Sequence, residues 1–314
     1  MQPSSAPGGK LVVAHAERRA QRSLQRLVGA SLCPVEVVGD VDALIGAVDE
    51  QTIAVVDLAI ARARPELVQR PARTWIAVPG EGLAPADAES VELLLTAGWP
   101  HVVTHPMPVL AEELLATVQK LIRGDVFGLE KYVAWGAEVR SYILDNTTDR
   151  DAAVTELAKD VIAVGLPDRV GSMVSVIADE LIANALYCAP VDERGAHFRS
   201  REPRDGARVL EGRDVVTVRW ATDARYLAVE VRDRWGSFEG SGLAGKLASA
   251  GKQSPASRDA GGMGLPLAYA CCNQFVLGVA PGKLTEVIAL LDVRYKPTEL
   301  GRASSFHLFR GSAP

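Results

Sequence analysis

Short apolar runs alternate with amphipathic helical patterns along residues 10–123, and this alternation constrains the fold more than any other feature of the chain. The expected strands are Leu11–Ala14, Val35–Val38, Thr52–Val56, Thr74–Val78 and His101–Thr104. The expected helices are Arg18–Leu27, Val41–Val48, Val91–Ala97 and Leu110–Ile122. Strands separated by helices of this length predict a parallel sheet with helices on both faces.

The pattern predicts an α/β class, with a flavodoxin-like order of parallel strands in the N-terminal domain. With 48% hydrophobic and 23% charged residues and a net charge of -5, the chain is typical of a globular protein without a basic nucleic-acid surface. We find no apolar run of about 18 residues and no signal-peptide pattern, so we expect a cytoplasmic protein that does not contact membranes. The 4 cysteines lack metal-ligand spacing, which indicates reduced thiols.

Residues 11–123, after a tail at 1–10, resemble the receiver domain of bacterial response regulators. Asp57 follows the third expected strand, where that family carries its phosphoacceptor. The run AGWPHVVTHPMPVLAEEL is similar to the family's fifth strand and last helix, with His105–Pro106 in place of Lys-Pro.

The receiver-like segment departs from that family at the positions that perform its chemistry. Receivers hold Mg²⁺ with an acidic pair after the first strand, whereas this chain has His15 and Ala16 there. The fourth strand runs into Pro79–Gly80, so the switch Ser/Thr is absent. Without the metal and the lysine, charge on a transferring phosphoryl group is poorly compensated. We therefore expect a pseudo-receiver that docks a partner, with Asp57 either a working phosphoacceptor or a carboxylate that caps its strand.

Residues 124–150 are expected to connect two domains. Apolar residues recur at near-helical spacing up to residue 146, which predicts a linker helix or a dimerisation helix. A dimerisation helix would make the protein a homodimer. The polar stretch at 146–149 marks a boundary. Because no histidine lies between residues 106 and 196, a self-phosphorylating histidine kinase is disfavoured.

Three separate segments of the C-terminal half carry residues suited to one nucleotide site. In SVIADELIANALYCAP, Glu180 and Asn184 are four residues apart and project from one face of a predicted helix. The Asn184 amide oxygen is a ligand suited to Mg²⁺, and the Glu180 carboxylate can accept a proton.

The other two segments add an adenine acceptor and a glycine-rich loop. Asp233 ends an alternating strand, and its carboxylate can accept a hydrogen bond from the exocyclic amine of adenine. Gly236 follows it and permits close backbone approach to a ligand. Gly261, Gly262 and Gly264 precede an apolar helical run, where backbone N–H groups can face phosphate. Taken alone, this loop is also compatible with a simple turn before a helix.

Together these segments resemble the N, G1 and G2 boxes of GHKL ATPases. The resemblance implies a GHKL-type α/β sandwich over residues 151–314 that binds ATP and Mg²⁺. Thr285 stands where the superfamily often has an adenine-site threonine, and residues 240–259 would form a lid. The lid carries three cations within reach of a γ-phosphate or solvent: Lys246, Lys252 and Arg258.

The GHKL-like boxes also depart from the family pattern in two places. Trp235 replaces the first glycine of the G1 box, and Tyr187–Ala189 replace a common His-Gly after the asparagine. These changes weaken the expectation that the chain turns over ATP more than the expectation that it binds ATP.

The resemblance is greatest to anti-sigma-factor serine kinases. It implies that Glu180 acts as a base toward a serine of a signalling partner, such as an anti-sigma antagonist, while Asn184 holds Mg²⁺. Two other functions stay open: a non-catalytic ATP-gated module that works by shape, and a slow ATPase or dimerisation clamp.

Overall fold

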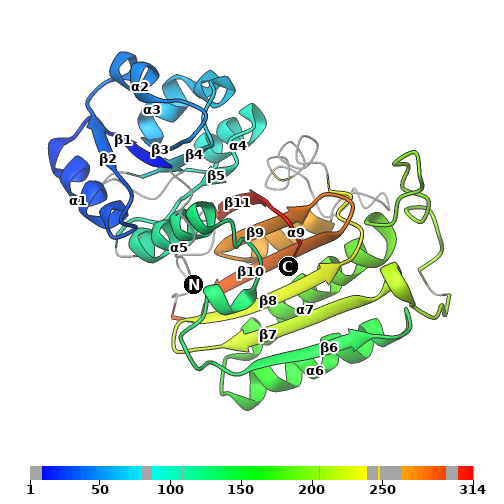
Figure 1. Cartoon of the computed structure of the whole chain (residues 1–314). Helices are drawn as coiled ribbons and strands as arrows, with labels where there is room; N and C mark the ends of the chain where they lie inside the picture. The colour runs from blue at the N-terminus through cyan, green and yellow to red at the C-terminus, as the bar shows by residue number, and fades with distance from the viewer. Residues whose placement is uncertain are drawn as a thin grey trace, which may run out of the picture. The chain divides into compact units, whose positions relative to one another are not determined.

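The computed structural model describes residues 9–79, 87–107, 109–204, 206–238, 247, 264–294 and 303–313. The chain divides into two compact units (Figure 1). The first unit comprises Met1–Val126 and Gly301–His307, and the second comprises Phe127–Leu300 and Leu308–Pro314. The division near residue 126 lies within the segment that the sequence assigned to a linker.

The first unit alternates strands and helices as its sequence predicts. Its elements are β1 (Lys10–Ala14), α1 (Arg18–Gly29), β2 (Val35–Val38), α2 (Val41–Ala47), β3 (Thr52–Asp57), α3 (Leu58–Ala63), η1 (Pro65–Gln69), β4 (Thr74–Val78), α4 (Ala88–Ala97), β5 (His101–Val102) and α5 (Val109–Arg123). The strands lie in the order β2-β1-β3-β4-β5, and every neighbouring pair is parallel. This arrangement confirms the expected parallel order.

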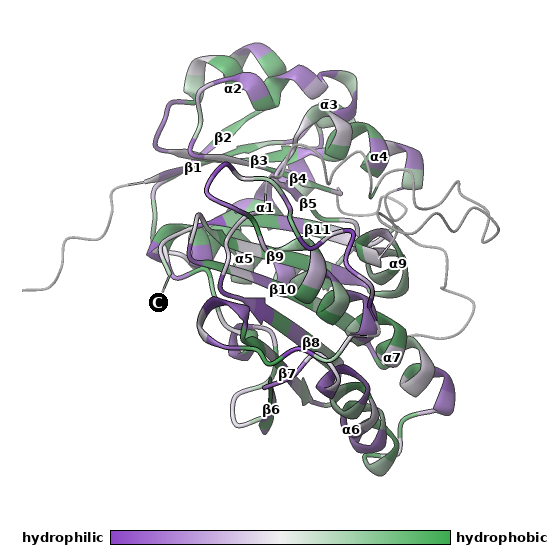
Figure 2. Ribbon diagram, turned by 90° about the vertical axis from the view of Figure 1, so that its right-hand side faces the viewer, coloured by the Kyte–Doolittle hydropathy of each residue, from purple (hydrophilic) through white to green (hydrophobic). Residues whose placement is uncertain are grey.

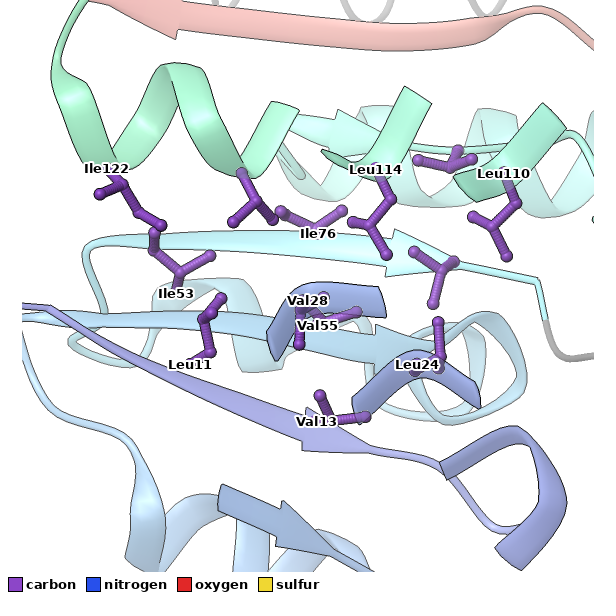
Figure 3. Packing of buried hydrophobic residues seen from close by; sticks show 13 residues of the cluster. Leu11, Val13, Leu24, Val28, Ile53, Val55, Ile76, Leu110, Leu114 and Ile122 are labelled. Carbon is purple, nitrogen blue, oxygen red and sulfur yellow. The ribbon is translucent and has the colours of Figure 1, made fainter. Parts of the chain in front are cut away.

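Apolar side chains from β1, β3 and β4 meet those of α1 and α5 in one buried cluster (Figure 3). Leu114 of α5 and Ile76 of β4 are both fully buried there, and Leu24 of α1 is nearly so. The i, i+4, i+8 spacing of Leu110, Leu114 and Val118 aligns one stripe of α5 with the sheet. Burial of each such side chain contributes roughly 1.5–3 kcal/mol before entropic costs.

The C-terminal strand β11 (Ser305–Arg310) begins in the first unit, where it lies antiparallel to β5. His307 pairs with His101, and Phe306 pairs with Val102. The short apolar run SSFHLF near the C-terminus is consistent with a strand, but its pattern does not indicate the sheet that it joins. The residues after His307 belong to the second unit, in which the Gly311 N–H donates to the carbonyl of Val279 at 3.1 Å.

The second unit is an antiparallel sheet covered on one face by helices. Its elements are η2 (Leu129–Lys131), β6 (Val139–Leu144), α6 (Asp149–Ala163), α7 (Asp168–Ala183), the π-helical turn η3 (Asn184–Cys188), η4 (Gly212–Asp214), β7 (Val216–Thr222), β8 (Tyr226–Asp233), α9 (Gly264–Cys271), β9 (Gln274–Ala280) and β10 (Leu284–Asp292). The strand order is β9-β10-β8-β7-β6. Figures 1 and 2 show α6, α7 and α9 along the same face of these strands. The chain is therefore a mixed α/β protein, as predicted.

The helix expected over residues 124–146 is absent, and this prediction is wrong. The segment begins with an irregular stretch and the short turn η2, and it ends in β6, which pairs antiparallel with β7. Gly128 and Gly136 adopt positive φ angles of 113° and 86°, which interrupt a helix. The residues Val139 to Leu144 include β-branched and aromatic side chains that favour a strand. A dimerisation helix at this place is therefore excluded.

The segment after Val126 covers part of the sheet face that the helices leave open. The Gly128 N–H donates to the Glu286 carboxylate at 3.0 and 3.1 Å, and the Leu129 N–H donates to Glu230 Oε1 at 3.0 Å. Arg219 and Arg232 form ion pairs with these buried carboxylates. Burial and the neighbouring Glu286 raise the pKa of Glu230 to about 7. Charge-assisted hydrogen bonds thus hold the segment on this face, together with the buried side chains of Phe127 and Leu129.

Contrary to the expectation from the sequence, one described helical stretch, Asp168–Cys188, is long and apolar enough to cross a membrane, with a mean hydropathy of 1.3. More than half of it, 56%, is buried inside the fold. The pattern is therefore that of a core helix, because burial in protein explains the same apolar composition.

Candidate functional site

Asp57 lies at the end of β3, as predicted, and its carboxylate caps helix α3 by accepting the Ala59 N–H at 2.8 Å. His15 lies beside it, with Nε2 3.4 Å from Asp57 Oδ2, and both side chains are buried. The Glu17 N–H donates to His15 Nδ1, so a neutral ring carries its proton on Nε2, facing Asp57. Asp57 thus caps the helix that follows its strand, and whether it also accepts a phosphoryl group stays a prediction.

His105, at the place of the receiver lysine, belongs to a buried polar cluster. Its Nδ1 lies 3.1 Å from the Ser305 hydroxyl and 3.3 Å from Glu113 Oε2. Glu113 Oε1 lies 2.8 Å from His307 Nε2, and His307 Nδ1 lies 3.3 Å from His101 Nδ1. Burial raises the pKa of Glu113, but the two imidazoles outweigh it and hold the pKa at about 2. This cluster joins α5, β5 and β11. No pattern in the sequence predicted that these buried polar side chains would meet.

Glu180 and Asn184 lie one turn apart at the end of α7, as predicted. The helix changes to a π turn at Asn184, and the Ala189 N–H donates to the Asn184 carbonyl at 2.9 Å. Both side chains are partly buried, and neither makes a hydrogen bond or ion pair within the described residues. A π turn at such a position re-aims the side chains that follow it, and such turns are frequent at functional sites.

Gly264 opens helix α9 directly against Glu180. A Cβ atom built on Gly264 would lie 2.5 Å from Glu180 Oε2 and 3.4 Å from its carboxyl carbon. Helix α7 also packs against α9. The structure therefore brings together the first of the three predicted segments and the end of the third. Gly261 and Gly262 lie outside the described residues, as does the predicted lid apart from the buried Leu247.

Asp233 and Thr285 face each other across the β8–β10 pairing. Asp233 is 4% exposed and lies on the helix-covered face, because Glu230, three residues earlier in the strand, points to the η2 face. The Thr285 hydroxyl is buried and faces the Asp233 carboxylate, whose pKa it helps to lower. Burial raises the pKa of Asp233 to about 6, although the N–H groups of Trp235 and Gly236 oppose that rise.

Gly236 is needed for a reason other than the one expected from its sequence. Its φ is 55°, and a Cβ atom there would lie 2.1 Å from the Ala280 carbonyl oxygen and 2.6 Å from the Lys283 nitrogen. The Gly282 N–H donates to the Gly236 carbonyl at 3.0 Å. The close backbone approach at Gly236 is therefore made by the β9–β10 turn of the same chain rather than by a ligand.

The loop after Asp233 meets the π turn that begins at Asn184. The Ser237 hydroxyl donates to the Ala189 carbonyl at 2.6 Å, and η3 packs on β8. Asp233 and Asn184 are thereby placed on neighbouring elements of one face. This hydrogen bond could not be predicted from the sequence, because both residues belong to loops without a pattern.

The carboxyl group of Glu180 lies in a mixed electrostatic environment. Burial and the adjacent Asp179 raise its pKa, while Arg150 and Arg204 lower it. Arg150 is held by Asp179 through two hydrogen bonds of 2.6 Å. A carboxyl with a raised pKa and no partner of its own is suited to proton transfer.

No family model and no curated protein matches the chain. Among solved structures, 24 chains match, and one of them is full-length FixJ from B. japonicum. That structure is 17% identical, covers 56% of this chain and 75% of its own, and superposes with a TM-score of 0.30. A similarity of this extent carries no conclusion about activity, ligand or partner.

Proposed function

We propose that the second unit binds Mg²⁺–ATP as a GHKL-type domain and phosphorylates a serine of a partner protein, in the manner of the anti-sigma-factor serine kinases that its sequence resembles. The observation that carries this proposal is the convergence of its predicted segments. Gly264 opens α9 against Glu180, and the loop after Asp233 is hydrogen-bonded to the end of the π turn of Asn184.

The residues present fit a magnesium-bound adenine nucleotide. At one end, Asp233 and Thr285 offer buried polar atoms suited to an adenine edge. At the other end, the amide of Asn184 offers an oxygen ligand suited to Mg²⁺. The buried carboxyl of Asp233, whose pKa is raised to about 6, is typical of a group kept for binding.

Bound ATP would supply the phosphoryl group, with Mg²⁺ offsetting charge on its oxygens. Glu180 would accept the proton of the attacking serine hydroxyl and orient it. Burial and Asp179 raise the pKa of Glu180, which makes the ionised carboxylate a stronger base. Asn184 would position the metal one helical turn away.

For the first unit we propose a docking role in signalling rather than phosphoryl transfer. His15 contacts Asp57 at the place where metal-dependent chemistry needs a carboxylate. His105, in place of the lysine, is engaged with Glu113 and Ser305. These contacts also favour the alternative function of the whole chain, an ATP-gated binding module, because one unit already lacks its expected chemistry.

The kinase proposal is tested by incubating the full chain with labelled ATP, Mg²⁺ and an array of serine-containing peptides. We expect label on a subset of peptides, and a loss of about 100-fold or more in rate for Glu180→Gln, as is typical when a general base is removed. Glu156→Gln, an exposed glutamate on α6, is the matched control and should keep the parent rate.

If no peptide is labelled although ATP binds to the chain, the kinase function is wrong and the binding module remains. Equal rates for the parent and Glu180→Gln would remove the proposed role of Glu180.

A further inference from the structure

The segment between the π turn η3 and β7, described at 189–204 and 206–214, is fixed to the candidate site. The Arg213 side chain donates to the carbonyls of Trp235 and Gly282 at 3.3 and 3.0 Å. The Tyr187 hydroxyl donates to the Arg204 carbonyl at 3.3 Å. The loop is rich in arginine: Arg194, Arg199, Arg201, Arg204, Arg208 and Arg213.

Three of these arginines are already engaged by the chain itself. Arg199 makes two hydrogen bonds of 2.7 Å with Asp214. Arg208 forms an ion pair with Glu202 through Nη1 at 2.5 Å, while its Nε and Nη2 are buried without a hydrogen-bond partner among the described residues. Arg213 lies over the Trp235 ring at 4.4 Å and donates to backbone carbonyls. Their positive charge is therefore used to hold the loop in place.

Arg204 differs, because it is held next to the site without a carboxylate partner among the described residues. Its guanidinium carbon lies 5.8 Å from the centre of the Tyr187 ring, and Tyr187 belongs to the π turn that begins at Asn184. Arg204 and Arg150 are the two arginines whose charge acts on Glu180. Since Arg150 is paired with Asp179, Arg204 is the one of these two arginines without an ion pair among the described residues.

We propose that Arg204 contacts the γ-phosphate of bound ATP, an inference that rests on the proposed function of the second unit. A base that deprotonates the attacking serine must lie beside the phosphoryl group that is transferred, and Arg204 acts electrostatically on that base. A guanidinium binds a terminal phosphate with two parallel hydrogen bonds, and it is less strongly hydrated than an ammonium. This assignment supplies a cation from the described fold, independent of the lid lysines.

The test compares the affinities of the full chain for ATP and ADP, each with excess Mg²⁺, by titration calorimetry. We expect Arg204→Ala to weaken ATP binding by about 10- to 100-fold, the effect of losing a charge-assisted contact, and to leave ADP binding within about twofold. Arg204→Lys should restore part of the ATP affinity. Arg201→Ala, an exposed arginine of the same loop, is the matched control and should change neither affinity.

The outcomes separate this inference from the function on which it rests. An unchanged ATP-to-ADP affinity ratio in Arg204→Ala overturns the contact while the nucleotide site stands. An equal loss of ATP and ADP affinity also overturns the contact, because Arg204 would then support the structure of the whole nucleotide site rather than bind the γ-phosphate. A parent chain that binds neither nucleotide ends the proposed function and this inference together.

Discussion

Burial gives Asp233 an energetic cost in the folded chain, because the pKa of its carboxyl is raised from 3.8 to about 6. Between these two values the folded state binds more protons than the unfolded state. The free energy of unfolding therefore falls as the pH rises through this window. A buried carboxylate that costs stability is typical of a residue kept for binding rather than for packing.

Asp233→Asn should therefore stabilise the ligand-free chain at pH 7 to 8, by on the order of 1–3 kcal/mol. The difference should shrink as the pH falls and vanish only well below 3.8, where the carboxyl is protonated in both states. Denaturant unfolding of both proteins at several pH values measures it. A variant less stable than the parent at every pH would show that the carboxylate stabilises the fold instead.

The residues of the candidate site were predicted with uneven success. Asp233, Asn184 and Glu180 could be found because each stands at a fixed place in a strand or helix pattern, and Thr285 through the resemblance to the GHKL superfamily. The contact between His15 and Asp57 could not, since it depends on how two separate strand ends are spaced. Arg204 could not be found either, because its loop has no periodicity and its role follows only from the contact with Tyr187.

At the scale of elements, the turn between β9 and β10 is packed on the loop that follows β8. Gly236 lies at this contact with a φ of 55° and no space for a side chain. Gly282, in the same turn, has a φ of 70° but open space around it. Alanine substitutions at these two glycines therefore distinguish the cost of a positive φ from the cost of steric overlap.

Gly236→Ala should lower the free energy of unfolding by about 2–5 kcal/mol, because strain and overpacking add. Gly282→Ala should cost only the strain of a positive φ, about 1–2 kcal/mol. Denaturant unfolding of the two variants provides the comparison. Equal losses would mean that the turn moves away from Gly236 without cost.

Element types were predictable where the hydrophobic period was long, as in α5, and where β-branched residues alternated, as in β8. The segment 124–146 shows why the prediction failed elsewhere. Its apolar residues fit a helical spacing by chance, while Gly128 and Gly136 require positive φ angles and Val139 to Leu144 form β6. The π turn at Asn184 carries no sequence signature of its own, because its residues favour an α-helix equally well.

At the scale of the whole molecule, the alternation of strands and helices was enough to predict a parallel sheet in the first unit. The addition of β11 to β5 was not predictable. It pairs residues about 200 positions apart, and the pairing depends on the buried contacts of His307 with Glu113 and His101. Such long-range pairings are selected by tertiary packing rather than by local pattern.

The account depends most on the second unit binding a magnesium-bound adenine nucleotide. Titration calorimetry of the full chain tests this directly, with ATP and GTP in the presence of Mg²⁺, for the parent and for Asn184→Ala. We predict saturable binding of ATP, much weaker binding of GTP, and an ATP affinity at least about tenfold lower in Asn184→Ala, as expected for a lost metal ligand. No heat of ATP binding to the parent, or equal affinities for ATP and GTP, would contradict the account.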